Sequence, residues 1–179
     1  TAGNLTRKVK GIVKSLPLWL KNISPIIVDN RTSFELDNGS FIKSAATSGD
    51  AGRSEALSLL ILDEAAHIDN MGELWIGLYS TLSTGGRCIA LSTPKGVGNW
   101  FHKTCVDSQA GVNNFHLTTL PWHVHPERDE NWFGKETKNM SKRQAAQELL
   151  CSFNTSGETV IEPDDMEWLL NNCQEPKYR

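Results

Sequence analysis

The first part of the chain alternates hydrophobic and polar positions with a helical period. Val9, Ile12, Val13 and Leu16 follow the i, i+3, i+4, i+7 spacing of an amphipathic helix, and basic residues lie between them. Because a residue before proline disfavours the helical conformation, Pro17 predicts the end of this helix. Short strands are expected next, over residues 25–29 and in a hairpin of residues 33–36 and 41–43 around an Asn-Gly turn.

An unbroken apolar run, residues 59–62, leads directly into Asp63 and Glu64. Four apolar residues in a row predict a strand that is buried on both faces. Since burying an unpaired carboxylate is costly, the two acids should lie at the solvent-facing end of the strand. In open α/β sheets, ligands bind at that end. An ordinary strand that leaves the core into a loop is the alternative interpretation of these six residues.

A second apolar strand, residues 89–91, runs into Ser92 and Thr93 about thirty residues later, which is the length of one βαβ unit. The intervening residues 71–82 predict a helix that is closed by Gly85-Gly86. Both strands thus end in side chains that can contact phosphate or metal. The expected elements that follow are a helix at 98–108, a strand at 115–120, a bend at 121–126, helices at 131–139 and 141–150, a linker after residue 153 and a short helix at 163–170.

Composition excludes several classes of protein. The chain has 179 residues, of which 39% are hydrophobic and 22% charged, as in a globular protein. No apolar stretch approaches the roughly 20 residues of a membrane span. The formal net charge is −3, and only residues 7–14 and 135–143 are locally basic, so the overall composition does not indicate DNA binding. The four cysteines never form a C-x-x-C pair, which favours reduced thiols, with Cys88 buried and inert. His123 and His125 lack a partner at metal-ligand spacing.

An apolar strand that ends in Asp-Glu is what the Walker B element of a nucleotide site needs. Such a site also needs a G-x-x-x-x-G-K-[ST] loop, and the chain has none. Residues 39–44 end in Lys-Ser, but they lack the second glycine and fall inside the predicted hairpin. Either the phosphate loop lies upstream of Thr1 or the chain is not an ATPase, and the spacing of the other motifs favours the first. The chain begins with Thr rather than Met and is expected to be processed or a fragment, which alone should not hydrolyse ATP.

The order of these segments resembles the large terminase subunit of tailed bacteriophages, the ATPase that drives DNA into the procapsid. The resemblance covers residues 25–165 and rests on SFELDNGSFI, LLILDEAAHI, ALSTPKG, the Pro-Trp at 121–122 with Pro126, and residues 147–157. It implies an α/β fold: an incomplete RecA-like P-loop NTPase core with an additional-strand catalytic glutamate. Residues 1–112 would belong to this core, 113–152 to a small lid subdomain, and 153–179 to a hinge before a nuclease domain that lies beyond the chain.

The resemblance also implies roles for matching residues. Asp63 corresponds to the aspartate that holds Mg²⁺, and Glu64 to the catalytic glutamate that activates water for ATP hydrolysis. Ser92 and Thr93 correspond to the coupling motif beside the γ-phosphate, although the chain has Leu91 where some relatives have a third hydroxyl residue. Arg53 matches an arginine that contacts phosphate or couples it to the lid. Relatives often have glycine next, where this chain has a serine, so a surface arginine without a catalytic role is the alternative.

The implied partners are double-stranded DNA, the portal protein, the small terminase subunit and further copies of the chain in a ring on the procapsid. The implied location is the host cytoplasm, at the portal, without a membrane, and the whole protein would also be an endonuclease. Two alternatives remain at this point: a helicase-type ATPase fragment, and a non-catalytic domain that retains the fold.

Overall fold

The structure is a computed structural model that describes residues 2–46, 56–153, 168, 169 and 172. Its fold is mixed α/β, with one antiparallel and one parallel sheet among these residues. The chain divides into two compact units, Thr1–Glu55 with Gly77–Thr81 (unit 1) and Ala56–Ile76 with Leu82–Arg179 (unit 2). The divisions expected near residues 112 and 152 remain predictions. No helix in the described part of the chain has both the length and the apolar character that a bilayer span requires.

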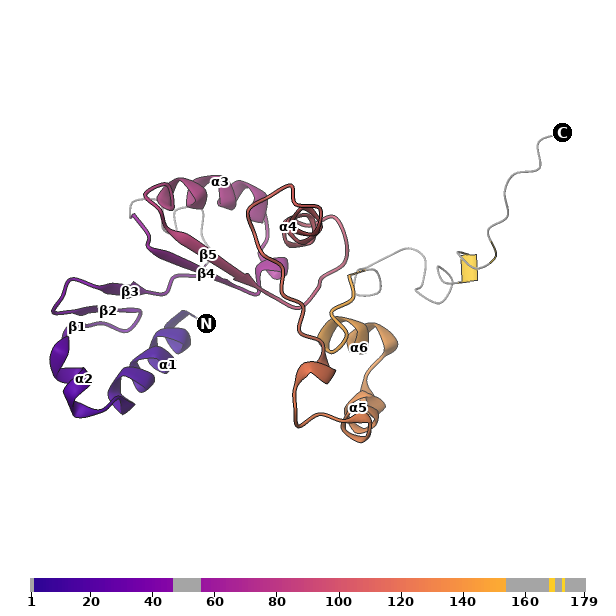
Figure 1. The fold of residues 1–179 in the computed structure, drawn as a ribbon, viewed down its shortest axis with the longest axis horizontal. Helices are drawn as coiled ribbons and strands as arrows, with labels where there is room; N and C mark the ends of the chain where they lie inside the picture. The colour runs from indigo at the N-terminus through magenta and orange to yellow at the C-terminus, as the bar shows by residue number, and fades with distance from the viewer. Residues whose placement is uncertain (1, 47–55, 154–167, 170–171, 173–179) are drawn as a thin grey trace. The chain divides into compact units, whose positions relative to one another are not determined.

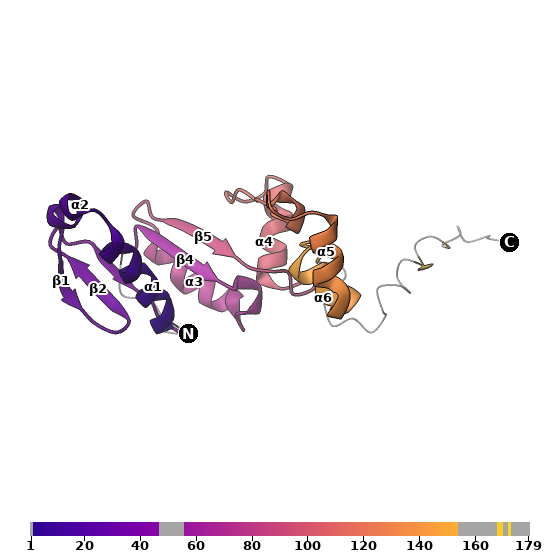
Figure 2. The same cartoon turned by 90° about the horizontal axis from the view of Figure 1, so that it is seen from below.

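Unit 1 combines two helices with a three-stranded antiparallel sheet (Figure 1, Figure 2). The strand order is β1-β2-β3, and the Asn-Gly hairpin is confirmed: the N–H of Gly39, at φ +79°, donates to the carbonyl of Leu36 at 2.9 Å. The first helix ends before Pro17, as predicted. The elements are α1 (Ala2–Ser15), α2 (Leu18–Ile23), β1 (Ile26–Asp29), β2 (Ser33–Leu36) and β3 (Phe41–Lys43).

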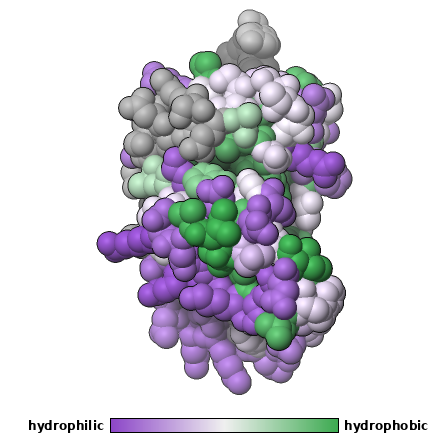
Figure 3. Space-filling model, turned by 90° about the vertical axis from the view of Figure 1, so that its left-hand side faces the viewer, coloured by the Kyte–Doolittle hydropathy of each residue, from purple (hydrophilic) through white to green (hydrophobic). Residues whose placement is uncertain are grey.

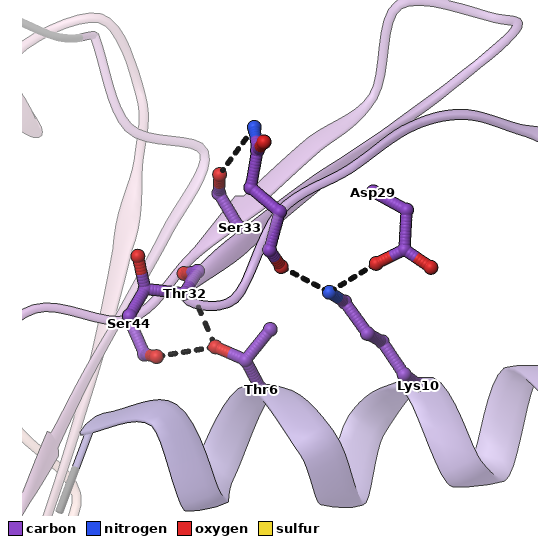
Figure 4. A network of polar contacts seen from close by, with 7 residues as sticks. Thr6, Lys10, Asp29, Thr32, Ser33 and Ser44 are labelled. Carbon is purple, nitrogen blue, oxygen red and sulfur yellow. Dashed lines mark hydrogen bonds and ion pairs between the residues drawn. The ribbon is translucent and has the colours of Figure 1, made fainter.

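A network of polar contacts joins α1 to this sheet (Figure 4). Thr6 is 1% exposed, and its hydroxyl donates to the carbonyl of Thr32 at 3.1 Å and shares a hydrogen bond with the Ser44 hydroxyl. One turn further along α1, the Lys10 ammonium forms an ion pair with Asp29. The predicted apolar face is only partly buried, since Ile12 is 63% exposed. The buried hydroxyl therefore contributes to positioning α1 on the sheet.

The outer surface of unit 1 carries several apolar side chains. Leu18, Trp19 and Ile23 of α2 are 70%, 64% and 69% exposed, and no residue of that helix is buried. Figure 3 looks onto this end of the unit and shows apolar patches set among hydrophilic side chains.

Unit 2 contains both strands of the predicted βαβ unit and the first part of the helix between them. The strands β4 (Leu59–Asp63) and β5 (Arg87–Leu91) pair in parallel, with Ile61 opposite Ile89 and Asp63 opposite Leu91. The helix α3 (Met71–Thr81) connects them and runs alongside the strands (Figures 1 and 2). The expected helix after β5 is α4 (Trp100–Gln109).

The parallel sheet is covered on one face only, so the prediction that β4 is buried on both faces is wrong. Leu62 is 6% exposed, whereas Leu59 and Ile61, on the opposite face of the same strand, are 49% and 57% exposed. In β5, Ile89 and Leu91 are 50% and 46% exposed. Successive side chains of a strand point to opposite faces, so these four apolar residues lie on the same face of the sheet. Parallel sheets are normally covered on both faces.

The turn before β5 requires glycine at a close backbone approach. The N–H groups of Gly85 and Gly86 donate to the carbonyl of Leu82 at 3.1 and 3.0 Å, which confirms the predicted glycine cap. A Cβ at Gly86 would lie 2.0 Å from the carbonyl oxygen of Leu57, so no larger residue fits without a backbone shift.

Residues 115–120 do not form the predicted strand. They have no strand partner among the described residues, and Phe115 instead packs against Trp75 and Trp100, with ring centroids 5.7 and 6.4 Å away. Aromatic packing therefore accounts for the apolar position that suggested a strand.

The remaining described segments form a small helical cluster. Its buried Trp122 stacks on Phe133 with ring centroids 4.7 Å apart. The predicted capping box is confirmed, because Ser141 and Gln144 each bond to the other's backbone N–H. The elements are η2 (Trp122–Val124), α5 (Glu130–Glu136), η3 (Thr137–Asn139) and α6 (Lys142–Glu148). Apart from residues 168 and 169, the expected linker and helix after residue 153 lie outside the described residues.

Candidate functional site

The parallel pairing of β4 and β5 brings the two polar strand ends together. Asp63 is opposite Leu91 in the register, and these two residues end β4 and β5. Glu64 and Ser92 are therefore the first residues after the two strands. The Ser92 Oγ lies 3.4 Å from the Glu64 Oε2. Asp63 and Glu64 are both solvent-exposed, as expected for acids at the solvent-facing end of an apolar strand. The predicted acidic and hydroxyl residues thus lie at one edge of one sheet.

The hydroxyl of Ser92 connects both strand ends. It accepts a hydrogen bond from the backbone N–H of Ala66 at 3.2 Å. Its own proton has two acceptors within reach, the Glu64 carboxylate at 3.4 Å and the carbonyl of Thr93 at 2.8 Å. Since a hydroxyl has one proton, it can donate to only one of these acceptors at full strength. A change in the charge or position of Glu64 can therefore alter the bonds of Ser92.

Glu64 has an unusual backbone conformation for a residue with a side chain. Its φ of 54° and ψ of 44° lie in the left-handed region, and η1 (Ala65–His67) begins directly after it. Non-glycine residues in this region store roughly 1–3 kcal/mol of strain, and such residues cluster at functional sites. Ala65 and Ala66 are 1% and 6% exposed, so small buried residues follow the glutamate immediately.

The loop after β5 is anchored to the start of α4. The side-chain amide of Asn99 donates to the carbonyls of Lys95 and Gly96 at 2.9 and 3.2 Å, and its oxygen caps α4 by accepting from the N–H of His102. Thr93, which is partly buried, lies within this loop next to Ser92. The loop that carries the predicted coupling residues is thus connected to a helix.

The donor atoms at this edge fit a hard cation better than a zinc ion. Two carboxylates and a hydroxyl are oxygen ligands, which Mg²⁺ prefers, and it usually takes only one or two carboxylates together with substrate phosphates. No group of three or more His, Cys, Asp or Glu residues with metal-binding geometry occurs in the described ranges. A dedicated all-protein metal cage is therefore not formed by these residues.

Two features of the site needed the structure. The Ala66 N–H as a donor to Ser92 and the left-handed conformation of Glu64 have no clear signal in the sequence. Arg53, the predicted phosphate or coupling contact, lies outside the described residues. Cys88 in β5 is half-buried, and burial raises the pKa of its thiol to about 11, as expected of an unreactive cysteine.

No family model matches the chain.

Proposed function

We propose that this chain is part of a large terminase subunit, an ATP-driven motor that packages double-stranded DNA, with a RecA-like nucleotide-binding core. The observation that carries the proposal is the 3.4 Å approach of the Ser92 hydroxyl to the Glu64 carboxylate across two parallel strands. In open α/β sheets, ligands bind outside the carboxyl ends of the strands, and this chain has an acidic pair and a hydroxyl pair at two adjacent carboxyl ends.

The proposal assigns a distinct task to each residue. Asp63 would hold Mg²⁺ together with the ATP phosphates, and bound Mg²⁺ supplies the positive charge that phosphoryl transfer requires. Glu64 would orient the attacking water and accept its proton. Its exposure leaves the carboxylate accessible to that water. The phosphates would be held by a loop that this chain does not contain.

The hydrogen bonds of Ser92 support a coupling role. Its hydroxyl accepts from the N–H of Ala66 and has two alternative acceptors for its proton, Glu64 and the carbonyl of Thr93 within the loop that leads to α4. When the contacts of Glu64 change on hydrolysis, the shared proton of Ser92 can move from one acceptor to the other. A local change at the phosphate would then reach the loop and helix behind it, a known route of switching.

The exposed face of the parallel sheet also supports the proposal. Within the described ranges, one apolar face of this sheet stays about half exposed, which is unusual for parallel strands; its residues are Leu59, Ile61, Ile89 and Leu91. A two-stranded sheet is also marginal in stability unless more strands or helices pack on it. The proposal accounts for both features, because a complete RecA-like core would supply further strands and helices.

The test is Glu64→Gln in the protein that includes its phosphate-binding loop. Loss of a general base lowers turnover by roughly 10²–10⁴-fold, so ATP hydrolysis should fall by that factor while nucleotide affinity stays within about twofold. Glu73→Gln, at an exposed position in the first turn of α3, is the matched control and should leave both unchanged. Unchanged turnover in Glu64→Gln would remove the catalytic assignment.

A further inference from the structure

Unit 1 has a charge opposite to that of the whole chain. Its residues, Thr1–Glu55 and Gly77–Thr81, contain eight Lys and Arg against five Asp and Glu, a formal charge of +3, whereas the entire chain carries −3. The net charge of the chain therefore conceals a basic region. Much of this positive charge is on α1 and on the turn between β1 and β2.

Four of these cations line one open groove. The groove has a volume of about 840 Å³ and is bordered by Arg7, Lys10 and Lys14 of α1 and by Arg31 of the β1–β2 turn. Lys10 is neutralised by its ion pair with Asp29 and has a side chain that is 12% exposed. Arg7, Lys14 and Arg31 are exposed and form no ion pair with a carboxylate of the described residues.

The cations on α1 form a stripe along the helix. Positions 7, 10 and 14 follow the i, i+3, i+7 spacing that places residues on one face of a helix. From Arg7 to Lys14 the stripe spans roughly 10 Å at 1.5 Å per residue. One strand of duplex DNA carries a phosphate about every 3.4 Å along its axis, so this length covers about three phosphates.

The lining of the groove has no apolar side chain. Besides the four cations it consists of Gly3, Asn4, Gly11 and Thr32. The surface therefore offers charge and hydrogen-bond donors but nothing that would bury a lipid tail, an apolar peptide residue or a base. Gly11 lines the groove and has open space where its Cβ would be, so a side chain at this position meets no neighbouring atom.

We infer that this groove binds the phosphate backbone of double-stranded DNA, without reading its sequence, through Arg7, Lys14 and Arg31. The inference rests on the proposed function for the choice of duplex DNA, because the lining alone specifies a polyanion. Contacts to phosphate position a protein on DNA and carry no sequence information. Arg31 holds a planar guanidinium that can bond two phosphate oxygens at once. Lys10 stabilises unit 1 through Asp29 and is not among the DNA contacts.

The first experiment compares two triple variants of the 179-residue chain by fluorescence anisotropy with a labelled duplex, without nucleotide. Arg7→Gln/Lys14→Gln/Arg31→Gln removes the groove cations. Lys103→Gln/Lys135→Gln/Lys138→Gln removes the same charge from exposed positions of unit 2. The groove variant should bind at least about tenfold more weakly and lose about one unit of salt slope per removed phosphate contact. The control should stay within about twofold of the unchanged chain.

A second pair of variants tests the effect of a negative charge in the groove without removing any of its cations. Gly11→Glu places a carboxylate in the groove, and Gly11→Gln places a neutral side chain of the same size there. Both residues favour a helix more than glycine does, so neither should unfold α1. Gly11→Glu should weaken DNA binding at least about fivefold relative to Gly11→Gln if phosphates occupy the groove.

Several outcomes would overturn the inference. These are equal losses in both triple variants, equal affinity of the two Gly11 variants, or no measurable binding of duplex by the unchanged chain. A groove-dependent loss on vesicles of anionic lipid that exceeds the loss on duplex would assign the site to a membrane surface instead. The DNA-binding assay contains no nucleotide. A negative result in it can therefore be distinguished from a negative result in the Glu64→Gln test, which measures ATP hydrolysis.

Discussion

The two units each contain an apolar strand that ends in aspartate, and these two aspartates have different surroundings. The strand β1 reads Ile-Ile-Val-Asp and β4 reads Leu-Leu-Ile-Leu-Asp. Asp29 accepts a hydrogen bond from the Lys10 ammonium, and this bond lowers the pKa of its carboxyl below the ordinary value of 3.8. Asp63 forms no ion pair with a cation of the described residues.

The difference arises from the strand beside each aspartate. The neighbour of β1 is antiparallel and places Phe34 opposite Asp29. The neighbour of β4 is parallel, so a second carboxyl end, with Ser92, lies next to the acids. An acid at the end of an apolar strand thus has a structural role in one sheet and a candidate ligand-binding role in the other. The neighbouring strand distinguishes the two cases.

The largest expected difference between the two aspartates is in nucleotide binding. In the protein with its phosphate-binding loop, Asp63→Ala should weaken Mg²⁺-nucleotide affinity about tenfold to a hundredfold, or roughly 1.4–2.7 kcal/mol, because a charged ligand is lost. Asp29→Ala should leave that affinity unchanged. Calorimetric titration of both variants with Mg²⁺-nucleotide measures this, and equal effects of the two substitutions would show that the two aspartates do not differ in nucleotide binding.

The next effect concerns the buried hydroxyl of unit 1. Thr6→Val keeps the shape of the side chain but removes the two hydrogen bonds of the Thr6 hydroxyl, to the Thr32 carbonyl and to the Ser44 hydroxyl. The Thr32 carbonyl still accepts from the Ser44 N–H at 2.8 Å. At about 1 kcal/mol for each lost bond, the free energy of unfolding should fall by about 2 kcal/mol. Thr6→Ser retains the hydroxyl and should lose less. Urea unfolding followed by circular dichroism measures both, and an equal loss would mean that the methyl group, not the hydroxyl, stabilises unit 1.

A smaller stability effect is expected for the hydroxyl of unit 2. Ser92→Ala removes the hydroxyl that accepts from the Ala66 N–H. This hydrogen bond is only partly buried. Water can replace part of that bond, so the free energy of unfolding should fall by about 1 kcal/mol. The same unfolding measurement applies. A loss larger than that of Thr6→Val would show that the strand-end cluster is primarily structural.

The smallest effect is the titration of Asp29. Lys10→Met should raise the pKa of Asp29 back toward 3.8, since the hydrogen bond to Lys10 is the main cause of the depression. Because the folded-state pKa lies below the unfolded one, this pair stabilises the fold above pH 3.8 and loses that contribution as the pH falls through the lowered value. Carboxyl NMR titration tests this, with Lys8→Met as control. An unchanged pKa in Lys10→Met would contradict the assignment.

Elements with strong local signals were predicted correctly from the sequence. Pro17 indicated the end of α1, Asn38-Gly39 the hairpin, and Ser141 with Gln144 the cap of α6. Each depends on interactions within a few residues. The strand expected at residues 115–120 was wrong because the position of Phe115 depends on Trp75 and Trp100, which are distant in the sequence.

The candidate site was predictable in its residue types but not in its geometry. The apolar runs before Asp63 and Ser92 placed both at strand ends. The sequence predicts only part of the groove beside α1. The helical spacing of its cations on α1 is visible in the sequence, whereas Arg31 joins them from the turn between β1 and β2.

The sequence alone determined the short-range features of this protein: its helix ends, its hairpin turn, and the acids and hydroxyls that follow its two apolar runs. Only the tertiary structure decided that β4 and β5 pair in parallel, that Ser92 contacts Glu64, that one face of their sheet stays exposed, and that Lys10 neutralises one aspartate but not the other. The reason is that local conformations depend on neighbouring residues, whereas these contacts join segments about 20 to 30 residues apart whose closure depends on the packing of the whole unit.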